Sequence, residues 1–274
     1  MKKISMILSV LMAVVMMTAC SQTSEKADGL NGTVTVGGST SVEGVILSAI
    51  EIFNEQNPDI TITYDPTGSS TGVKSAASGD YDIGLASRDV KSSETEELKA
   101  KGTVFAIDGI AIIVNNENVI KDLSIEQIAN IANGSVKNWK DLGGSDAPIV
   151  LIGREAGSGT RDGFESIVGV EECVYEQALT STGAVIGAVS QNPNAIGYAS
   201  LSSVDEKVKA ITVEGVEASE ATIKDGSYKV QRNFNFVTID GKELSPSAQA
   251  FYDFLLSSDA DELIKNAGAV ATAK

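Results

Sequence analysis

The sequence predicts an α/β fold with mainly parallel sheets. Short apolar and β-branched segments of strand length alternate along the chain with segments whose apolar residues recur at helical spacing. Three of the strand segments run into a loop rich in Gly, Ser and Thr and then into a helix, an order typical of units whose strands lie parallel. No repeat long enough to indicate a solenoid is present. With 274 residues, the chain is long enough for one large domain or two smaller ones beyond its N-terminal segment.

The first of these units along the chain begins with the strand 34–36, which runs into Gly37-Gly38-Ser39-Thr40-Ser41. The strand 60–64 runs in the same way into Gly68-Ser69-Ser70-Thr71-Gly72, and a helical pattern follows each loop. Ser87 and Arg88 end a further short strand. They are candidates for a site that such loops form, and an arginine in solvent is the alternative.

The third unit, residues 148–168, is the most informative. An apolar run leads, as a buried strand would, into the loop 153–160, and apolar residues then follow at helical spacing. Glycines let backbone N–H groups converge, Ser158 and Thr160 add hydroxyls, and the helix start adds partial positive charge. Arg154 adds a full charge and a planar fork of donors. The loop is suited to an anion, with an ordinary turn as the alternative. Three such helix N-termini offer enough donors to surround a small tetrahedral oxyanion.

The rest of the chain continues the alternation of strands and helices. A long apolar run, 103–114, is interrupted by a turn residue only at Gly109, and it is long enough to cross from one domain to another. After Asn115 a second group of elements begins. The further elements expected from residue spacing are helices at 94–101, 125–132 and 247–256 and strands at 195–198, 208–213 and 234–239.

Residues 1–19 have the composition of a secretion signal. Two lysines precede an apolar run, Met6 to Met17, that is too short for a lasting membrane span. Residues 17–20, Met-Thr-Ala-Cys, resemble the lipobox of bacterial lipoproteins, with Met17 where Leu is usual. We therefore expect a lipidated N-terminus at Cys20 and a polar tether over 20–31. A plain secretory signal with an incidental cysteine is the alternative.

Charge and cysteine content exclude several kinds of protein. The net charge of −16 argues against nucleic-acid binding and against adhesion to an anionic membrane through basic residues. With Cys20 committed to the N-terminus, Cys173 has no partner for an internal disulfide. The negative charge does not exclude an anion site, because local dipoles and donors govern a buried site more than distant screened carboxylates do.

Four motifs, in this order along the chain, resemble the substrate-binding protein of the bacterial high-affinity phosphate ABC transporter. They are Gly38 to Ser41, Gly68 to Lys74, Asp82 to Arg88 and Gly153 to Arg161. The Arg-x-x-Gly-Ser-Gly-Thr element of the last is the most specific, and the resemblance extends from about residue 32 to the C-terminus. It implies a two-domain, type II periplasmic-binding-protein fold with phosphate held in the cleft. Domain I would comprise 32–111 and 234–274, and domain II would comprise 112–233.

The resemblance also implies which residues bind phosphate. The family's ligands fall on Thr40, Ser41, Ser69, Arg154, Ser158, Gly159 and Thr160. Ser87 and Arg88 complete the expected set. Two departures matter: some family members place an aspartate directly after the serine that matches Ser87, where this chain has Arg88, and another where it has Ala156. The first departure leaves open how a protonated phosphate oxygen is recognised.

Asp108 is the candidate for the missing proton acceptor. It interrupts an apolar β run beside Gly109, where a carboxylate needs some reason to be tolerated. Near neutral pH phosphate carries at least one proton and sulfate carries none, so a buried acceptor would favour phosphate. The alternative is that Asp108 pairs with an arginine and only shapes the cleft.

Enzymatic functions find little support. The chain has no histidine, so a Ser-His-Asp triad is impossible, although a Ser-Lys variant at Ser158 stays formally open. No G-x-x-x-x-G-K-[ST] sequence is present for nucleotide phosphates. A metal centre is poorly supported because histidine is absent and the carboxylates are spread along the chain. We predict no enzymatic activity, no cofactor and no metal.

The predicted function is therefore that of a receptor. Together the signal, the lipobox and the resemblance imply a monomeric, lipid-anchored protein on the extracytoplasmic face of the cell membrane. It would capture inorganic phosphate and deliver it to the permease subunits of an ABC transporter by closure of two domains. The alternatives are a receptor for another tetrahedral oxyanion, such as sulfate or molybdate, and a surface adhesin or signalling lipoprotein.

Overall fold

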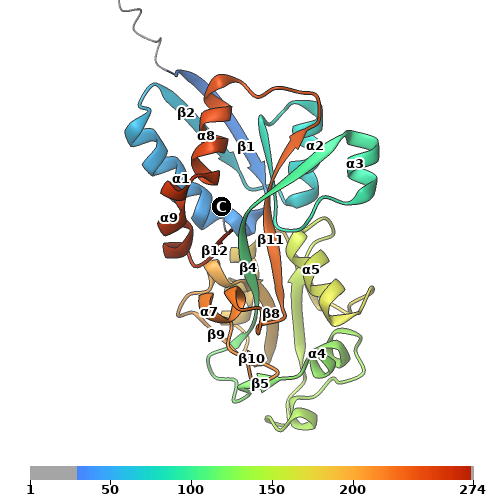
Figure 1. The fold of residues 1–274 in the computed structure, drawn as a ribbon. Helices are drawn as coiled ribbons and strands as arrows, with labels where there is room; N and C mark the ends of the chain where they lie inside the picture. Colours follow the sequence, from blue (N-terminus) through green and yellow to red (C-terminus); the bar gives the residue numbers. More distant parts are fainter. Residues whose placement is uncertain (1–29, 273–274) are drawn as a thin grey trace, which may run out of the picture.

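Two long antiparallel strands run through both halves of the molecule (Figure 1). They are β4 (Ala100–Asn115) and β11 (Gln231–Ile239), and in the computed structural model, which describes residues 30–272, they connect two lobes. The predicted signal 1–19, Cys20 and most of the predicted tether lie outside the described residues. Within the described residues, no helix combines the length and apolarity that crossing a membrane requires.

Lobe I holds the N-terminal elements and the C-terminal helices. Its helices pack around the parallel strands β2, β1 and β3, and β3 pairs antiparallel with β11 (Figure 1). The elements are β1 (Gly32–Gly38), η1 (Thr40–Val42), α1 (Glu43–Gln56), β2 (Ile60–Asp65), α2 (Ser69–Ser78), β3 (Ile83–Ala86), α3 (Ser92–Leu98), α8 (Pro246–Leu256), η4 (Ser258–Ala260), α9 (Asp261–Asn266) and β12 (Val270–Ala271).

Lobe II holds the middle of the chain. Its parallel strands β8, β6 and β7 continue the same sheet, with β8 antiparallel to β4. The elements are β5 (Asp122–Leu123), α4 (Ile125–Ala132), η2 (Trp139–Leu142), β6 (Val150–Arg154), α5 (Gly159–Val168), β7 (Gln177–Leu179), α6 (Thr182–Ser190), β8 (Ala195–Ser200), η3 (Leu201–Ser203), β9 (Val208–Ala210), β10 (Thr212–Val213) and α7 (Glu220–Lys224).

The chain passes between the lobes where β4 changes its partner. Up to Gly109 the strand pairs with β11, and from Ile110 onward it pairs with β8. The side chain that precedes this point, Asp108, is fully buried, and it faces Arg232 across the two strands. The crossing therefore combines a change of strand partner with a buried ion pair.

Each lobe has its own apolar core. In lobe I, Phe105 stacks on Phe236 with ring centroids 4.6 Å apart. In lobe II, Phe164 of α5 stacks on Tyr198 of β8 at 4.2 Å. Burial of these rings together with the aliphatic side chains around them is the main favourable contribution to the folding of each lobe. The two cores lie on opposite sides of the crossing and leave a polar interface between the lobes.

The α/β prediction is confirmed, and the structure refines its details. The strands that precede the glycine-rich loops are parallel as predicted, whereas the crossing strands pair antiparallel, so the sheet is mixed. The helix expected at 94–101 ends at Leu98, because Lys99 takes a left-handed conformation with φ of 57° and the chain then enters β4. The strand expected at 208–213 is split into β9 and β10.

Candidate anion site between the lobes

Four helix N-termini meet between the lobes, two from each lobe. They belong to α1, which η1 precedes, and α2 in lobe I, and to α5 and α6 in lobe II. Each follows a strand and a loop of small polar residues, and the first backbone N–H groups of each helix have no carbonyl partner within that helix. The sequence predicted three of these N-termini, and α6 is the fourth.

Hydroxyl groups from the two lobes contact one another at this point. Ser41 Oγ lies 2.7 Å from Thr160 Oγ1 and 3.1 Å from Thr182 Oγ1. Thr40 Oγ1 lies 3.0 Å from Thr182 Oγ1, and it also accepts a hydrogen bond from the backbone N–H of Thr182 at 3.2 Å. All four side chains are buried. The hydroxyls form a continuous cluster that spans the interface.

A second contact between the lobes is made at Gly159. In lobe I, Ser69 Oγ accepts the backbone N–H of Ser87 at 3.1 Å, and the two hydroxyl oxygens are 3.3 Å apart. A Cβ atom added to Gly159 would lie 2.5 Å from Ser69 Oγ and 2.7 Å from Ser87 Oγ. Only glycine allows the first turn of α5 to come this close. Ser158 directly before it is the buried N-cap of α5 and accepts the N–H of Arg161.

Arg154 is the cationic group of the cluster. Its side chain is 2 % exposed, and Nη1 donates to Thr182 Oγ1 at 3.1 Å. Nε and Nη2 form a bidentate pair with Glu155, with both distances 2.9 Å. Ala156, where some family members have an aspartate, directly follows Glu155. The carboxylate of Glu155 partly neutralises the arginine. Pairing of this kind reduces the cost of burying a guanidinium.

Two tyrosines and an arginine fix the backbone of Arg154. Its N–H donates to Tyr198 OH at 3.1 Å, and that hydroxyl donates to Tyr175 OH at 3.0 Å. Arg161 Nη1 donates to the carbonyl oxygen of Arg154 at 3.2 Å, and Arg161 itself pairs with Glu165. Burial raises the pKa of both tyrosines, so their hydroxyls stay neutral donors. Both backbone polar groups of Arg154 therefore have fixed partners.

Thr182 is the contact residue that the sequence analysis missed. It contacts Thr40, Ser41 and Arg154, which is more of the cluster than any predicted residue contacts. A signal was present: the strand β7 runs into Thr-Ser-Thr-Gly at 180–183 and then into α6, which repeats the pattern of the other loops. The strand is only three residues long, so its pattern was too short to be read as a strand.

Arg88 requires a correction, because its guanidinium serves ion pairs in place of the cluster. Nη1 and Nη2 bind the carboxylate of Glu94 at 2.8 and 2.7 Å, and Nε lies 3.0 Å from Asp162 Oδ2. Nη1 also donates to the carbonyl of Asp89, and Nη2 to Ser70 Oγ. None of these contacts reaches the hydroxyl cluster, whereas Arg154 contacts Thr182, so Arg88 is left out of the ligand set proposed below.

The contacts of Asp108 bear on the two interpretations that its sequence left open. Its Oδ2 accepts Ser200 Oγ at 2.8 Å and Arg232 Nη2 at 2.9 Å, and Oδ1 accepts the N–H of Ser202 at 3.5 Å. Burial raises the pKa of this carboxyl, while the guanidinium and the hydroxyl act in the opposite direction. These contacts favour the alternative, in which Asp108 pairs with an arginine. They do not support a role as the acceptor of a ligand proton.

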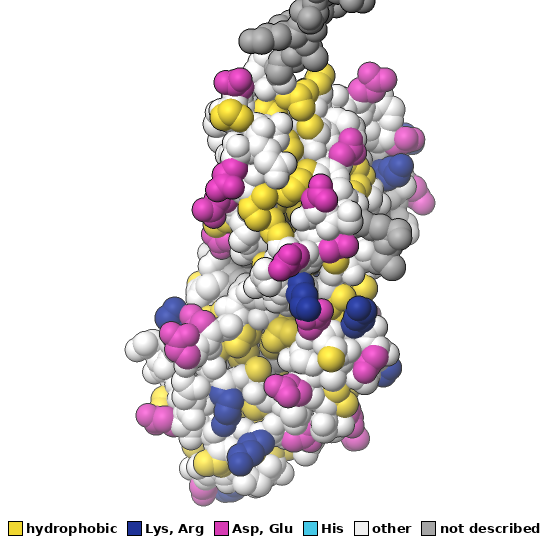
Figure 2. Space-filling view, turned by 60° about the vertical axis from the view of Figure 1, so that its left-hand side comes forward, with side chains coloured by type: hydrophobic (Ala, Val, Ile, Leu, Met, Phe, Trp, Pro, Cys, Tyr) yellow, Lys and Arg dark blue, Asp and Glu magenta, His cyan; other side chains and the backbone are white. Residues whose placement is uncertain are grey.

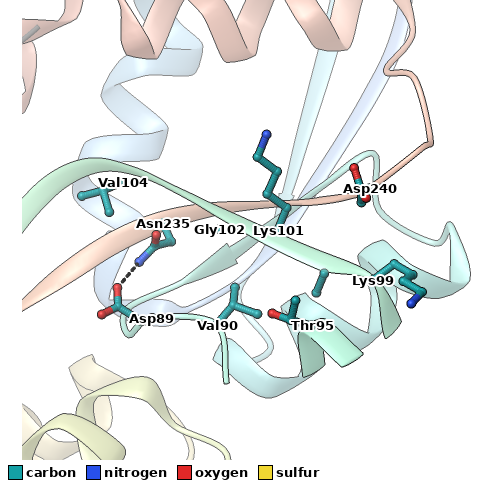
Figure 3. Close-up of a pocket in the computed structure, with 10 residues that line it drawn as sticks. Asp89, Val90, Thr95, Lys99, Lys101, Gly102, Val104, Asn235 and Asp240 are labelled. Carbon is teal, nitrogen blue, oxygen red and sulfur yellow. Dashed lines mark hydrogen bonds between the residues drawn. The ribbon is translucent and has the colours of Figure 1, made fainter. Parts of the chain in front are cut away.

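Two further observations on the described residues concern a cavity elsewhere in lobe I and the grouping of metal-ligating side chains. A cavity of ≈690 Å³ lies in lobe I between α3 and the β4–β11 pair, away from the hydroxyl cluster, where Asn235 bonds Asp89 (Figure 3). Within residues 30–272, no three metal-ligating side chains are grouped. Neutral hydroxyls, helix N-termini and one paired arginine suit reversible binding of a small oxyanion.

Comparison with known proteins adds independent information. The model of a PBP superfamily domain matches residues 23–259. The phosphate-binding protein PstS of Bacillus subtilis is 33% identical, over 96% of this chain and 92% of the relative, and that of Borreliella burgdorferi is 31% identical, over 98% of both. One similar structure is that of a Clostridium perfringens protein assigned as a phosphate ABC transporter substrate-binding protein, with bound phosphate. It is 41% identical, with a TM-score of 0.85, and the match covers 88% of this chain and 100% of that chain. An ABC-type phosphate transport receptor from Vibrio cholerae is 32% identical with a TM-score of 0.71, over 87% of this chain and 100% of its own.

Replacing Gly159 tests the close approach of the lobes. In Gly159→Ala the added methyl group collides with Ser69 and Ser87, and overpacking of this kind costs about 1–3 kcal/mol. We expect oxyanion binding, measured by calorimetry, to weaken by about tenfold or more. Gly183→Ala on α6 is the matched control, because nothing lies within 4 Å of a Cβ there. Equal affinities in the two variants would contradict the close approach.

Replacing Asp108 separates a structural role from a role in ligand selection. Asp108→Asn leaves the buried Arg232 without a counter-charge, and two further donors of that arginine, Nε and Nη1, already lack hydrogen-bond partners among the described residues. We expect the free energy of unfolding in urea to fall by about 3 kcal/mol. Asp146→Asn is the control: it removes an exposed carboxylate and should change the free energy of unfolding little. A lower phosphate-to-sulfate affinity ratio in Asp108→Asn would restore Asp108 as the discriminating acceptor.

Proposed function

The chain belongs to the PBP superfamily, in the family of phosphate-binding proteins PstS, and we propose that it is an extracytoplasmic receptor that binds inorganic phosphate between its lobes. It then delivers the phosphate to the permease of an ABC transporter. The observation that carries this proposal is the meeting of four helix N-termini, buried hydroxyls and Arg154 from opposite lobes. A transport receptor of this family needs no catalytic groups, in keeping with a chain that contains no histidine.

We propose a ligand set that follows the cluster. Lobe I supplies its donors from two loops and from the end of β3, and lobe II supplies its donors from the loops before α5 and α6. The set is Thr40, Ser41, Ser69, Ser87, Arg154, Ser158, Gly159, Thr160 and Thr182. Apart from that of Ser158, which caps α5, these hydroxyls bond to one another in this structure, and they turn toward the phosphate oxygens when the ligand enters, because a hydroxyl is free to rotate.

Hydroxyl groups can also accept the phosphate proton in place of the missing aspartate. A hydroxyl both donates and accepts, so Ser or Thr takes the proton of a phosphate oxygen where other family members use a carboxylate. A neutral acceptor facing a sulfate oxygen can turn its own hydrogen toward that oxygen, whereas a carboxylate cannot. Selection against sulfate is therefore weaker in this chain than in a relative with the aspartate.

Closure takes place about the two crossing strands. Domain I is 32–111 with 234–274, and domain II is 112–233. Each ligand residue belongs to one of the two, so the bound state is stable only when they close on the phosphate. A monomer suffices for this proposal, since the proposed ligand set is complete within one chain. Acidic side chains are scattered over both lobes on the face shown in Figure 2. Solvent and salt screen their effect on the buried site.

The N-terminus anchors the receptor to the membrane in this proposal. Residues 1–19 direct export, Cys20 carries the lipid, and the segment to residue 31 links the anchor to β1. An anchor on the extracytoplasmic face keeps the receptor close to the permease.

Substitution of Arg154 tests the ligand assignment. A charge-assisted hydrogen bond contributes about 1.5–3 kcal/mol, so Arg154→Ala should weaken phosphate binding at least about tenfold. Arg154→Lys should recover only part of the loss, because a single ammonium group cannot bind Glu155 through two nitrogens and also donate into the cluster as Nη1 does. Titration calorimetry measures both variants, with Lys140→Ala, which removes an exposed pair with Asp146, as the comparison away from the site. An unchanged affinity in Arg154→Ala would remove this residue from the site.

Substitution of Cys20 tests the anchor. One acyl chain holds a protein to a membrane only marginally and several hold it firmly, so the lipidated protein should sediment with membranes. Cys20→Ala should appear in the soluble fraction or the medium. A variant that fractionates like the wild-type protein would contradict lipidation at this residue.

A further inference from the structure

An ion-pair cluster joins the lobes beside the proposed phosphate ligands. Asp162 lies in the first turn of α5 in lobe II, two residues beyond Thr160. Its Oδ2 atom lies 2.8 Å from Nζ of Lys91 and 3.0 Å from Nε of Arg88, and both cations belong to lobe I. The three side chains therefore link the two lobes without touching the hydroxyl cluster.

Arg88 is held in place by its own lobe. Its bidentate bonds to Glu94 and its bond to the carbonyl of Asp89 are all made within lobe I. Burial opposes ionisation of Glu94, but hydrogen bonds from Arg88 and from the backbone of Lys91 hold the pKa of Glu94 below its ordinary value. These bonds do not depend on closure. Arg88 is thus directed toward Asp162 before the lobes meet, so pairing with Asp162 costs little additional side-chain entropy.

The cluster also lies close to the ligands in sequence. Arg88 directly follows Ser87, and Asp162 follows Gly159 and Thr160 on the first turn of α5. We infer that Asp162 is a positioning residue for phosphate: through Arg88 and Lys91 it holds the Ser87 loop against the first turn of α5 and slows release of the ligand. The inference rests on the proposed function. In it, the ion pairs of Asp162 stabilise the closed state in addition to the contacts that phosphate itself makes.

Solvent access sets the size of this contribution. The Arg88 side chain is 6% exposed and that of Asp162 is 25% exposed, whereas Lys91 is half exposed. A cavity of ≈470 Å³ beside them, which Arg88, Lys91 and Asp162 help to line, admits water and salt. A partly buried pair is worth more than an exposed one, and it is weakened by salt where solvent reaches it.

Release kinetics test the inference directly. The rate at which radiolabelled inorganic phosphate leaves the full chain, measured by rapid filtration, should rise about fivefold in Asp162→Asn and less in Lys91→Ala. The association rate should stay unchanged in both, which a general loss of structure would not produce. Adding about 0.5 M sodium chloride should speed release from the wild-type protein and have a much smaller effect on Asp162→Asn.

A double variant and a control complete the test. In Lys91→Ala with Asp162→Asn the effect of the lysine should disappear, because its partner is already neutral. Lys140→Ala removes an exposed pair with Asp146 inside lobe II and should leave release unchanged. Release at the wild-type rate in both Asp162→Asn and Lys91→Ala would overturn the inference. If wild-type protein bound no phosphate at all, the proposed function would fail instead.

Discussion

The close approach of the first turn of α5 to the loops of lobe I is the constraint on which the site depends. It requires a residue without a side chain at 159, because Ser69 and Ser87 occupy the space that a Cβ would need. The same approach brings Thr160 to Ser41 and the carbonyl of Gly157 to the backbone N–H of Ser70, 3.0 Å away. Donors from two separately folded lobes thus become one set of ligands, and no single lobe provides it.

The interface between the lobes is polar at its centre, and ion pairs lie at two places beside it. At the crossing, Asp108 and Arg232 form a buried pair, and Ser200 and Ser202 bond to the carboxylate. A buried pair adds little net stability, but separating the partners is costly. On the first turn of α5, Asp162 pairs with two cations of lobe I, Arg88 and Lys91. The first pair joins the two crossing strands, and the second acts where the lobes meet.

Much of this arrangement follows from local sequence, and the remainder does not. The loops before α1, α2 and α5 were predicted because strand, Gly/Ser/Thr loop and helix signals are contiguous in the chain. Thr182 was missed because its strand is short, although its loop has the same composition. The directions of Arg88 and Asp108 had no local signal. Arg88 turns to Asp162 on another lobe, and Asp108 pairs with Arg232, 124 residues later. Such partners are set by tertiary packing, which spacing along the chain does not reveal.

Titration calorimetry with three anions tests the central claim most directly. The protein beginning at Ser21 should bind one phosphate per chain, and it should bind sulfate and molybdate more weakly at the same pH. A hydroxyl cluster closed around one arginine predicts this order by a small margin: phosphate alone of the three brings a proton that a hydroxyl can accept, but the same hydroxyl can donate to a sulfate oxygen instead. Tighter binding of sulfate than of phosphate, or no binding of phosphate, would contradict the account.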